Sequence, residues 1–215
     1  VQAAEKEMAE KNMADILVGN NKKKDIAQIL EEYFAVKAVK EEQQVPLVSE
    51  VIDINHTKEY EDLTIHKVNE HTRAYIKIQD GCNQFCSYCI IPYTRGRIRS
   101  KNPEEVIEEV KNLAAQGYKE IVLTGIHLSS YGKDLGDITL LDVIQRIQQI
   151  EDIERIRLGS LEPRIITEQF VKELRACDKV CPHFHLSLQS GCDETLKRMN
   201  RKYTTEEYET ALNVL

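Results

Sequence analysis

Three cysteines lie close together on one short segment of this chain, at a C-x3-C-x2-C spacing: Cys82, Cys86 and Cys89. The segment before them, residues 73–79, alternates apolar and polar side chains in the manner of a half-buried strand. Asp80-Gly81 then breaks this pattern, so the three thiols leave the end of a strand together. Thiolates that cluster in a reducing compartment usually hold a metal, and this segment is therefore the first candidate for chemistry.

The number of thiols favours an iron–sulfur cluster over zinc. A structural zinc ion takes four ligands, commonly from two C-x2-C pairs, and the segment offers no second pair. A 4Fe–4S cluster has four irons and can take three ligands from the protein, which leaves one iron open to a substrate. A zinc site without chemistry, or three unrelated thiols, is the alternative.

Composition and charge limit the class of protein. Of the 215 residues, 41% are hydrophobic and 30% are charged, which is typical of a globular protein. We expect a cytoplasmic protein, since six cysteines in a metal-type pattern favour a reducing cytosol over a disulfide framework. No apolar run approaches membrane-spanning length, and no secretory signal is present. The net charge of −7 is unusual for a protein that binds RNA, so RNA binding would need a local basic patch or further sequence. The chain begins at Val1 and stops within a predicted helix, and we therefore expect an internal fragment of a longer protein.

The N-terminal part reads as the tail of a small α/β domain, residues 1–44, followed by a linker, residues 45–66. We expect helix formers at 1–14, a short strand at 16–19, a helix at 26–36 that Asp25 caps, and an edge strand at 48–54. Three histidines in or near the linker are expected to be surface residues: His56, His66 and His71.

The second predicted domain, residues 67–215, alternates strands with amphipathic helices. Strands are expected at residues 73–79, 120–125, 155–158 and 183–188. Helices are expected from the cap at Asn102 to Gly117, at 140–150, at 167–176, and from a capping box that begins at Thr204. Four βα units predict a parallel sheet and part of a barrel, whose functional residues lie at the carboxyl ends of the strands. Polar residues stand at or just after the ends of three of these strands, at Thr124-Gly125, Glu162 and Gln189, although such residues also serve ordinary turns.

A basic segment follows the cysteines and is a candidate for RNA contacts: Arg95, Arg97, Arg99 and Lys101. Its charges stand beside Tyr93, and basic side chains with an aromatic suit phosphate contacts and base stacking. A second basic cluster is equally well explained as a solvated face: Lys197, Arg198, Arg201 and Lys202. The other cysteines match no common ligand set and are expected to be buried structural thiols: Cys177, Cys181 and Cys192.

The residues around the cysteines resemble the radical S-adenosylmethionine (SAM) methylthiotransferase family. The resemblance covers residues 16–215 and is carried by residues 81–97, with Tyr88 one position before the last cysteine, and by residues 188–201. Residues 124–132, Thr-Gly-Ile-His-Leu-Ser-Ser-Tyr-Gly, are most similar to the branch that acts on N6-threonylcarbamoyladenosine in tRNA. The isopentenyladenosine branch usually has Gln-Asn-Val-Asn there.

The resemblance implies a partial β6/α6 barrel, of which this chain holds the first four βα units. It also implies that the three cysteines hold a 4Fe–4S cluster whose open iron chelates the amino and carboxylate groups of SAM. Cleavage of SAM then gives methionine and a 5′-deoxyadenosyl radical. Tyr88 would contact the adenine, Thr124-Gly125 would face the methionine amino group, and Glu162 and Gln189 would complete the pocket.

The implied reaction methylthiolates carbon 2 of the adenosine at position 37, next to the anticodon. It needs an electron donor such as flavodoxin or ferredoxin, and a second 4Fe–4S cluster held by an N-terminal domain. No cysteine precedes Cys82, so we expect these 215 residues not to perform the full reaction. The alternatives are another tRNA adenosine or a ribosomal protein aspartate as substrate. A zinc-stabilised binding module is the alternative of another class.

Overall fold

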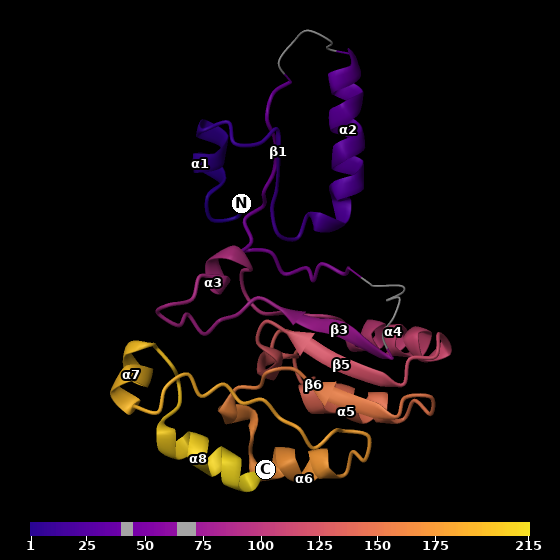
Figure 1. Ribbon diagram of the computed structural model, residues 1–215, viewed down its shortest axis with the longest axis vertical. Coiled ribbons are helices and arrows are strands. Elements are labelled where there is room, and N and C mark those ends of the chain that lie inside the picture. Colours follow the sequence, from indigo (N-terminus) through magenta and orange to yellow (C-terminus); the bar gives the residue numbers. More distant parts are fainter. Residues whose placement is uncertain (40–44, 64–71) are drawn as a thin grey trace.

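The computed structural model describes residues 1–39, 45–63 and 72–215. Its N-terminal part is slender and stands at one end of a larger α/β core (Figure 1). This part consists of α1 (Glu5–Glu10), β1 (Ile16–Val18), α2 (Ile26–Val39) and β2 (Val48–Glu50). β1 and β2 pair in parallel, with Ile16 opposite Val48. The predicted strand and helices are confirmed, and the edge strand is shorter than expected.

Several predictions fall outside the described residues. These are the domain boundaries near residues 44 and 67, together with His66 and His71. His56 is described, and its exposed ring lies 2.6 Å from the Asp53 carboxylate, as a surface residue would.

The core is a four-stranded sheet in the order β4-β3-β5-β6. β3 (Arg73–Asp80), β5 (Glu120–Gly125) and β6 (Arg155–Leu158) run parallel, as the sequence predicts. The short β4 (Arg99–Ser100) pairs antiparallel with the end of β3 and was not predicted. Three crossover helices pack against the sheet and enclose the hydrophobic core (Figure 1): α4 (Pro103–Ala115), α5 (Leu140–Gln148) and α6 (Glu168–Arg175).

The helices begin where their capping residues stand. The Asn102 side chain accepts a hydrogen bond from the Glu104 N–H, with Pro103 in the first turn of α4. Thr139 and Asp142 form a capping box for α5. Further along the chain lie the short α7 (Asp193–Arg198) and α8 (Thr205–Val214). No helix in the described ranges is long and apolar enough to cross a membrane.

The strand predicted at residues 183–188 does not form a regular ladder, and this prediction is wrong. In the described ranges the segment forms one isolated bridge, between Leu161 and Leu186. The Leu161 N–H donates to the His185 carbonyl at 2.9 Å, and the Ser187 N–H donates to the Leu161 carbonyl at 3.0 Å. Two features of the chain explain the short pairing. Pro182 has no N–H to donate, and the partner segment turns at once into the 3-10 helix η3 (Pro163–Ile165).

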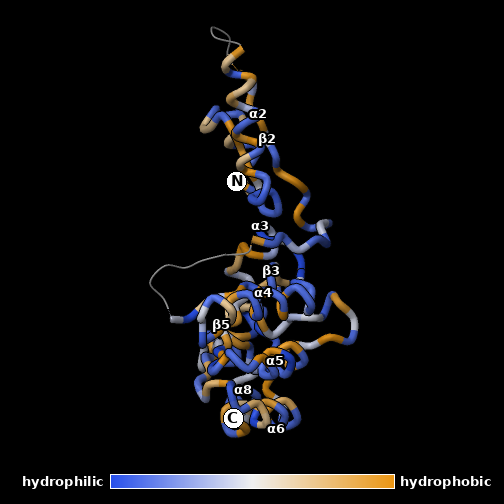
Figure 2. Tube along the Cα trace, turned by 90° about the vertical axis from the view of Figure 1, so that its right-hand side faces the viewer, coloured by the Kyte–Doolittle hydropathy of each residue, from blue (hydrophilic) through white to orange (hydrophobic). Residues whose placement is uncertain are grey.

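α2 carries apolar side chains that the described chain leaves exposed. Phe34 is 58% exposed and Val39 is 85% exposed, while only Ile29 and Tyr33 are buried. Figure 2 shows α2 away from the core, with hydrophobic (orange) stretches along its length.

Candidate functional site

The cysteine loop, residues 82–89, begins at a glycine that no other residue could replace without a clash. Gly81 has a positive φ of 71°, and a Cβ built on it would lie 1.8 Å from the Arg97 carbonyl oxygen. The Cys82 N–H donates to the Gly96 carbonyl at 3.0 Å. The chain therefore leaves β3, forms the loop, and returns directly against the loop's first residue.

Gln79 connects this loop to the neighbouring strand and was missed by the sequence analysis. Its side chain is fully buried, and its Nε2 donates to the carbonyls of Asp80 at 2.7 Å and Gly81 at 2.8 Å. Its Oε1 accepts from the His127 N–H at 2.7 Å. The ends of β3 and β5 are thereby held together at the carboxyl edge of the sheet.

The three cysteines are free thiols on this loop, with Cys82 and Cys86 buried and Cys89 half-buried. The Cys89 N–H donates to the Cys86 carbonyl at 2.9 Å, and the Gln84 N–H lies 3.4 Å from the Cys82 sulfur. Burial raises the pKa of the Cys82 thiol, the Gln84 N–H lowers it, and the nearby Cys86 and Cys89 thiols raise it further. The three thiols are therefore close enough to affect one another, as a shared metal site requires.

The thiols are nevertheless not gathered into a finished metal site. Among the described residues, no three His, Cys, Asp or Glu side chains form a group that could hold a metal ion. The donor set fits a cluster that takes three thiolates, because all three stand on one loop and none is used in a disulfide. Rotation of these side chains would have to bring the sulfurs together.

Of the residues expected to shape a cofactor pocket, Tyr88 and Gln189 are in direct contact. The Tyr88 hydroxyl donates to Gln189 Oε1 at 3.0 Å, across 101 residues of sequence. Tyr88 is 54% exposed, so about half of this residue is open to solvent. Gln189 has a positive φ of 68°, which turns the chain sharply at this contact.

The other expected pocket residues are held by local hydrogen bonds. The Thr124 hydroxyl donates to the Ile76 carbonyl at 3.1 Å, and Gly125 packs against the Gln79 side chain, whose Cβ and Oε1 a Cβ on Gly125 would meet at 2.9 Å. Glu162 is buried and pairs with Arg164 at 2.6 Å. Arg164 also reaches Gln84 Oε1 at 3.3 Å, so Glu162 is linked to the cysteine loop through one arginine.

Two of the four basic residues expected to contact RNA are buried, which corrects that prediction. Arg99 is 1% exposed and its Nη2 lies 3.8 Å from the Asp80 carboxylate. Lys101 is 2% exposed and pairs with Asp62 at 2.8 Å and Glu109 at 2.7 Å. Buried cations are retained where carboxylates compensate their charge, and both side chains have such partners. Both charges are therefore turned into the protein and away from solvent.

The other two basic residues differ from each other. Arg97 is exposed, with its guanidinium 4.6 Å from the centre of the Phe85 ring. Arg95 lies 3.6 Å from the Asp80 carboxylate with its side chain 35% exposed. Arg97 is thus the member of this segment with the freest charge.

His127 follows β5 and is a second residue that the sequence analysis did not single out. Its Nδ1 is hydrogen-bonded to the Ser130 hydroxyl, and its buried Nε2 has no partner in the described part of the chain. Burial lowers its pKa to about 4, although Glu162 acts in the opposite direction. The ring is therefore neutral at pH 7.

The remaining cysteines have different environments. Cys177 is 4% exposed within the hydrophobic core, as expected for a structural thiol, and Cys181 is half-buried. Cys192 is exposed, so the expectation of a buried thiol is wrong there.

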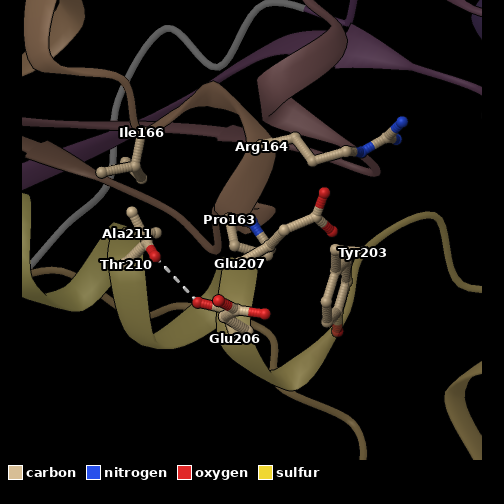
Figure 3. Close-up of a pocket in the computed structure, with 8 residues that line it drawn as sticks. All are labelled: Pro163, Arg164, Ile166, Tyr203, Glu206, Glu207, Thr210 and Ala211. Carbon is tan, nitrogen blue, oxygen red and sulfur yellow. Dashed lines mark hydrogen bonds between the residues drawn. The ribbon is translucent and has the colours of Figure 1, made fainter. Parts of the chain in front are cut away.

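A cavity of about 340 Å³ lies between η3 and α8 (Figure 3). Its lining includes Arg164, Tyr203, Glu206 and Glu207. In Figure 3 the Glu206 and Glu207 carboxylates lie on the α8 side of this space. Glu207 accepts from the Thr204 N–H at 2.7 Å as part of the α8 capping box. No cluster cysteine lines this cavity, and it is not the candidate site.

The chain is similar in sequence to curated proteins that are named as tRNA-modifying enzymes. A threonylcarbamoyladenosine tRNA methylthiotransferase, MtaB, of Bacillus subtilis is 40% identical over 94% of this chain and 43% of its own length. The Aquifex aeolicus protein of the same name is 39% identical over 100% of this chain and 50% of its own. A tRNA-2-methylthio-N(6)-dimethylallyladenosine synthase of Thermoanaerobacter is 49% identical over 74% of this chain and 34% of its own. The chain thus spans half or less of the length of these relatives.

Solved structures support the fold. The cobalamin-dependent SAM radical enzyme OxsB superposes with a TM-score of 0.58 at 15% identity, over 99% of this chain and 36% of that one. The radical SAM methyltransferase TsrM of Kitasatospora setae superposes with a TM-score of 0.53 at 21% identity, over 66% of this chain and 28% of that one. The sequence model of the radical SAM superfamily matches residues 76–215.

Proposed function

Because this chain belongs to the radical SAM superfamily, we propose that it forms the cluster- and SAM-binding part of a tRNA methylthiotransferase. The observation that carries this proposal is the cysteine loop, which places three free thiols at the carboxyl end of β3. The tRNA methylthiotransferases of Bacillus subtilis and Aquifex aeolicus support the reaction class, since their similarity extends over nearly all of this chain.

Within this class, we propose N6-threonylcarbamoyladenosine at position 37 as the substrate and carbon 2 as the modified atom. The similarity to the two MtaB proteins extends over 94% and 100% of this chain, and residues 124–132 resemble that branch. The dimethylallyladenosine branch is the second candidate, because the Thermoanaerobacter protein is more nearly identical over a shorter stretch.

Cys82, Cys86 and Cys89 would hold the 4Fe–4S cluster, and SAM would bind beside Tyr88, Thr124, Gly125, Glu162 and Gln189. When bound, the cluster supplies the electron that cleaves SAM. The chain's own residues set the conditions for this chemistry. Gln79 fixes the edge on which the loop stands, and the Tyr88–Gln189 hydrogen bond joins two of the residues proposed to bind SAM. Burial of Cys82 and Cys86 keeps water away from two of the three ligands.

The domain organisation, the second cluster, the electron donor and the RNA contacts are proposed on the same basis. Residues 1–44 would belong to the N-terminal methylthiotransferase domain, 45–66 to a linker and 67–215 to the radical SAM core. A second 4Fe–4S cluster has no thiol ligands before Cys82, so we expect these 215 residues to bind one cluster without inserting sulfur. A flavodoxin or ferredoxin would supply electrons in the cytoplasm, and tRNA would contact Arg97 with Arg95 beside it.

Two measurements test the proposal. Anaerobic reconstitution should give about four irons per chain, and Cys82→Ser, Cys86→Ser or Cys89→Ser should each remove the cluster while Cys192→Ser retains it. Zinc in place of iron and sulfide would support the non-catalytic alternative.

The substrate is tested in cells that lack the full-length gene. Nucleoside mass spectrometry of their tRNA should show N6-threonylcarbamoyladenosine without its methylthio group, and the full gene should restore that group. Loss of the methylthio group from isopentenyladenosine alone would select the second candidate. Unchanged tRNA would contradict both.

A further inference from the structure

The turn that follows α7, residues 199–201, contacts the cysteine loop although the two are more than a hundred residues apart in sequence. The Met199 carbonyl accepts from the Ser87 N–H at 3.1 Å. Asn200 and Arg201 each add side-chain contacts to the same loop. α7 and this turn lie on the same side of the core as the loop that leaves β3 (Figure 1). The 199–201 turn therefore contacts the expected cluster ligands directly, and the function proposed above gives it no role.

Asn200 binds the backbone of the loop at its most unusual residue. Its Nδ2 donates to the Gln84 carbonyl at 3.3 Å and to the Phe85 carbonyl at 2.8 Å. Phe85 has a positive φ of 50°, which an aromatic residue rarely adopts and which persists only where the surroundings hold it. Phe85 stands immediately before Cys86, so its conformation determines where the second thiol points.

The orientation of the Asn200 amide is itself fixed. Lys202 Nζ donates to Asn200 Oδ1 at 2.6 Å. The oxygen of the amide is thereby turned toward a cation, which leaves the nitrogen to face the two loop carbonyls. Lys202 and Asn200 thus form a chain of hydrogen bonds that ends on the loop.

Arg201 binds one of the thiols directly. Its Nη1 lies 3.4 Å from the Cys86 sulfur, and its guanidinium is 5.0 Å from the centre of the Tyr203 ring. The Nε of Arg201 is buried and has no hydrogen-bond partner in the described ranges. A cationic donor at a cysteine sulfur stabilises negative charge there, and hydrogen bonds to cluster sulfurs are one of the means by which proteins set cluster potentials.

We propose that the 199–201 turn is a positioning element for the cluster ligands, in which Asn200 holds the loop backbone and Arg201 stabilises negative charge on the Cys86 sulfur. The Arg201 part rests on the proposed function, because it concerns the cluster-bound state. The Asn200 part does not, because it concerns hydrogen bonds between residues of the chain itself. Arg201 is accordingly not part of a solvated basic face.

The first test uses metal-free protein and measures the alkylation rate of each cysteine by iodoacetamide and mass spectrometry. Asn200→Asp keeps the size of the side chain but presents an oxygen to the two loop carbonyls. We expect alkylation of the buried Cys82 and Cys86 to accelerate roughly tenfold, because loss of these hydrogen bonds favours opening of the loop. Cys177, which is buried elsewhere, should keep its rate.

Lys197→Gln is the matched control, since Lys197 lies in the same basic cluster and is exposed. If Asn200→Asp fails to fold, Asn200→Gly removes the amide and readily adopts the positive φ of 58° found at this position. Rates at Cys82 and Cys86 that match the wild type in a folded variant would overturn the Asn200 part. An equal acceleration in Lys197→Gln would overturn it too.

The second test uses reconstituted protein and a redox titration followed by electron paramagnetic resonance. Arg201→Met should shift the cluster potential to more negative values, and Arg201→Lys should restore part of the shift. An unchanged potential in Arg201→Met would overturn the role of Arg201. If the wild-type chain itself takes up no iron–sulfur cluster, the proposed function and the Arg201 role both fail, and the alkylation comparison still decides the Asn200 role.

Discussion

Replacement of Gln79 by leucine gives the most direct measure of how the candidate site is attached to the sheet. The Gln79 side chain makes hydrogen bonds to Asp80, Gly81 and His127, all between 2.7 and 2.8 Å, and it is fully buried. Leucine has a similar volume, so Gln79→Leu removes the hydrogen bonds with little change in packing. The site then contains a buried N–H and two buried carbonyls that have lost this partner.

The size of the expected loss in stability follows from the burial of the groups that Gln79 binds. A hydrogen bond contributes about 1 kcal/mol net, and a buried group left without a partner costs about 1–3 kcal/mol. We therefore expect the free energy of unfolding to fall by about 3–5 kcal/mol. Because Gln79 ties the cysteine loop to the end of β5, the affinity for SAM should fall in the same variant.

Urea unfolding followed by circular dichroism measures the first effect, and equilibrium dialysis with SAM measures the second. Gln116→Leu is the matched control, because Gln116 is exposed at the end of α4 and should change stability by less than about 0.5 kcal/mol. A cost below about 1 kcal/mol for Gln79→Leu, or a similar cost for both variants, would refute the view that this side chain joins the two strand ends.

Three further substitutions test other parts of the structure. Gly81→Ala should cost more than about 3 kcal/mol in urea unfolding, since its Cβ would clash with Arg97, whereas Gly136→Ala, at a positive φ of 86° with open space around it, should cost only about 1 kcal/mol. Lys101→Met should cost about 3 kcal/mol by the same measurement, because it leaves the Glu109 carboxylate without its buried cation, while the exposed Lys111→Met should be nearly neutral. The folded-state pKa of His127 lies below its usual 6.5, at about 4, so its contribution is complete above pH 6.5 and is lost as the pH falls toward 4. Stability measured across this range should therefore decline less steeply in His127→Gln, by about 2–3 kcal/mol, and an identical pH profile would contradict the buried neutral ring.

Local signals were sufficient to predict most elements of the core. The helix starts at Asn102, Thr139 and Thr204 are determined by side chains within three residues of each cap, so a short stretch of sequence contains the whole cause. The cysteine loop was predictable for a similar reason, because strand alternation stops at Asp80-Gly81 just before the thiols. Each of these features depends on neighbours in sequence.

The features that the sequence did not predict correctly depend on partners that are far away in sequence. Alternation along β3 assigns Gln79 to the face opposite Ile78, which suggests exposure, yet the end of the strand is covered on both faces. Arg99 and Lys101 stand among other basic residues and read as solvated charges. Their burial depends on Asp80 and on Asp62, which lies 39 residues before Lys101. The strand expected at 183–188 failed because its partner segment turns away, which the segment itself does not encode.

The burial of these cations changes what the basic segment does in the molecule. Lys101 pairs with Asp62, and burial alone would lower the pKa of Lys101, but Asp62 and Glu109 raise it above its usual value. Gly96 lies against the Ile54 carbonyl, where an added Cβ would come within 2.2 Å of the oxygen, and Asn20 donates to the Thr94 carbonyl. The segment from Thr94 to Lys101 therefore joins the N-terminal part of the chain to the core, immediately beside the cysteine loop.

The contact between the segment from Thr94 to Lys101 and the N-terminal part bears on the proposed methylthiolation. Gly96 also accepts the hydrogen bond from Cys82, so the contact with the N-terminal part and the contact with the first thiol share one residue. In the proposed reaction a second cluster, held by the N-terminal domain, must approach the cluster of the core. A short, buried and ion-paired connection suits that requirement better than a flexible linker, because it fixes the position of one domain relative to the thiols of the other. The buried positive charge of this segment, on Arg99 and Lys101, is accordingly paired with carboxylates inside the protein, and Arg97 is the member of the segment whose side chain is exposed.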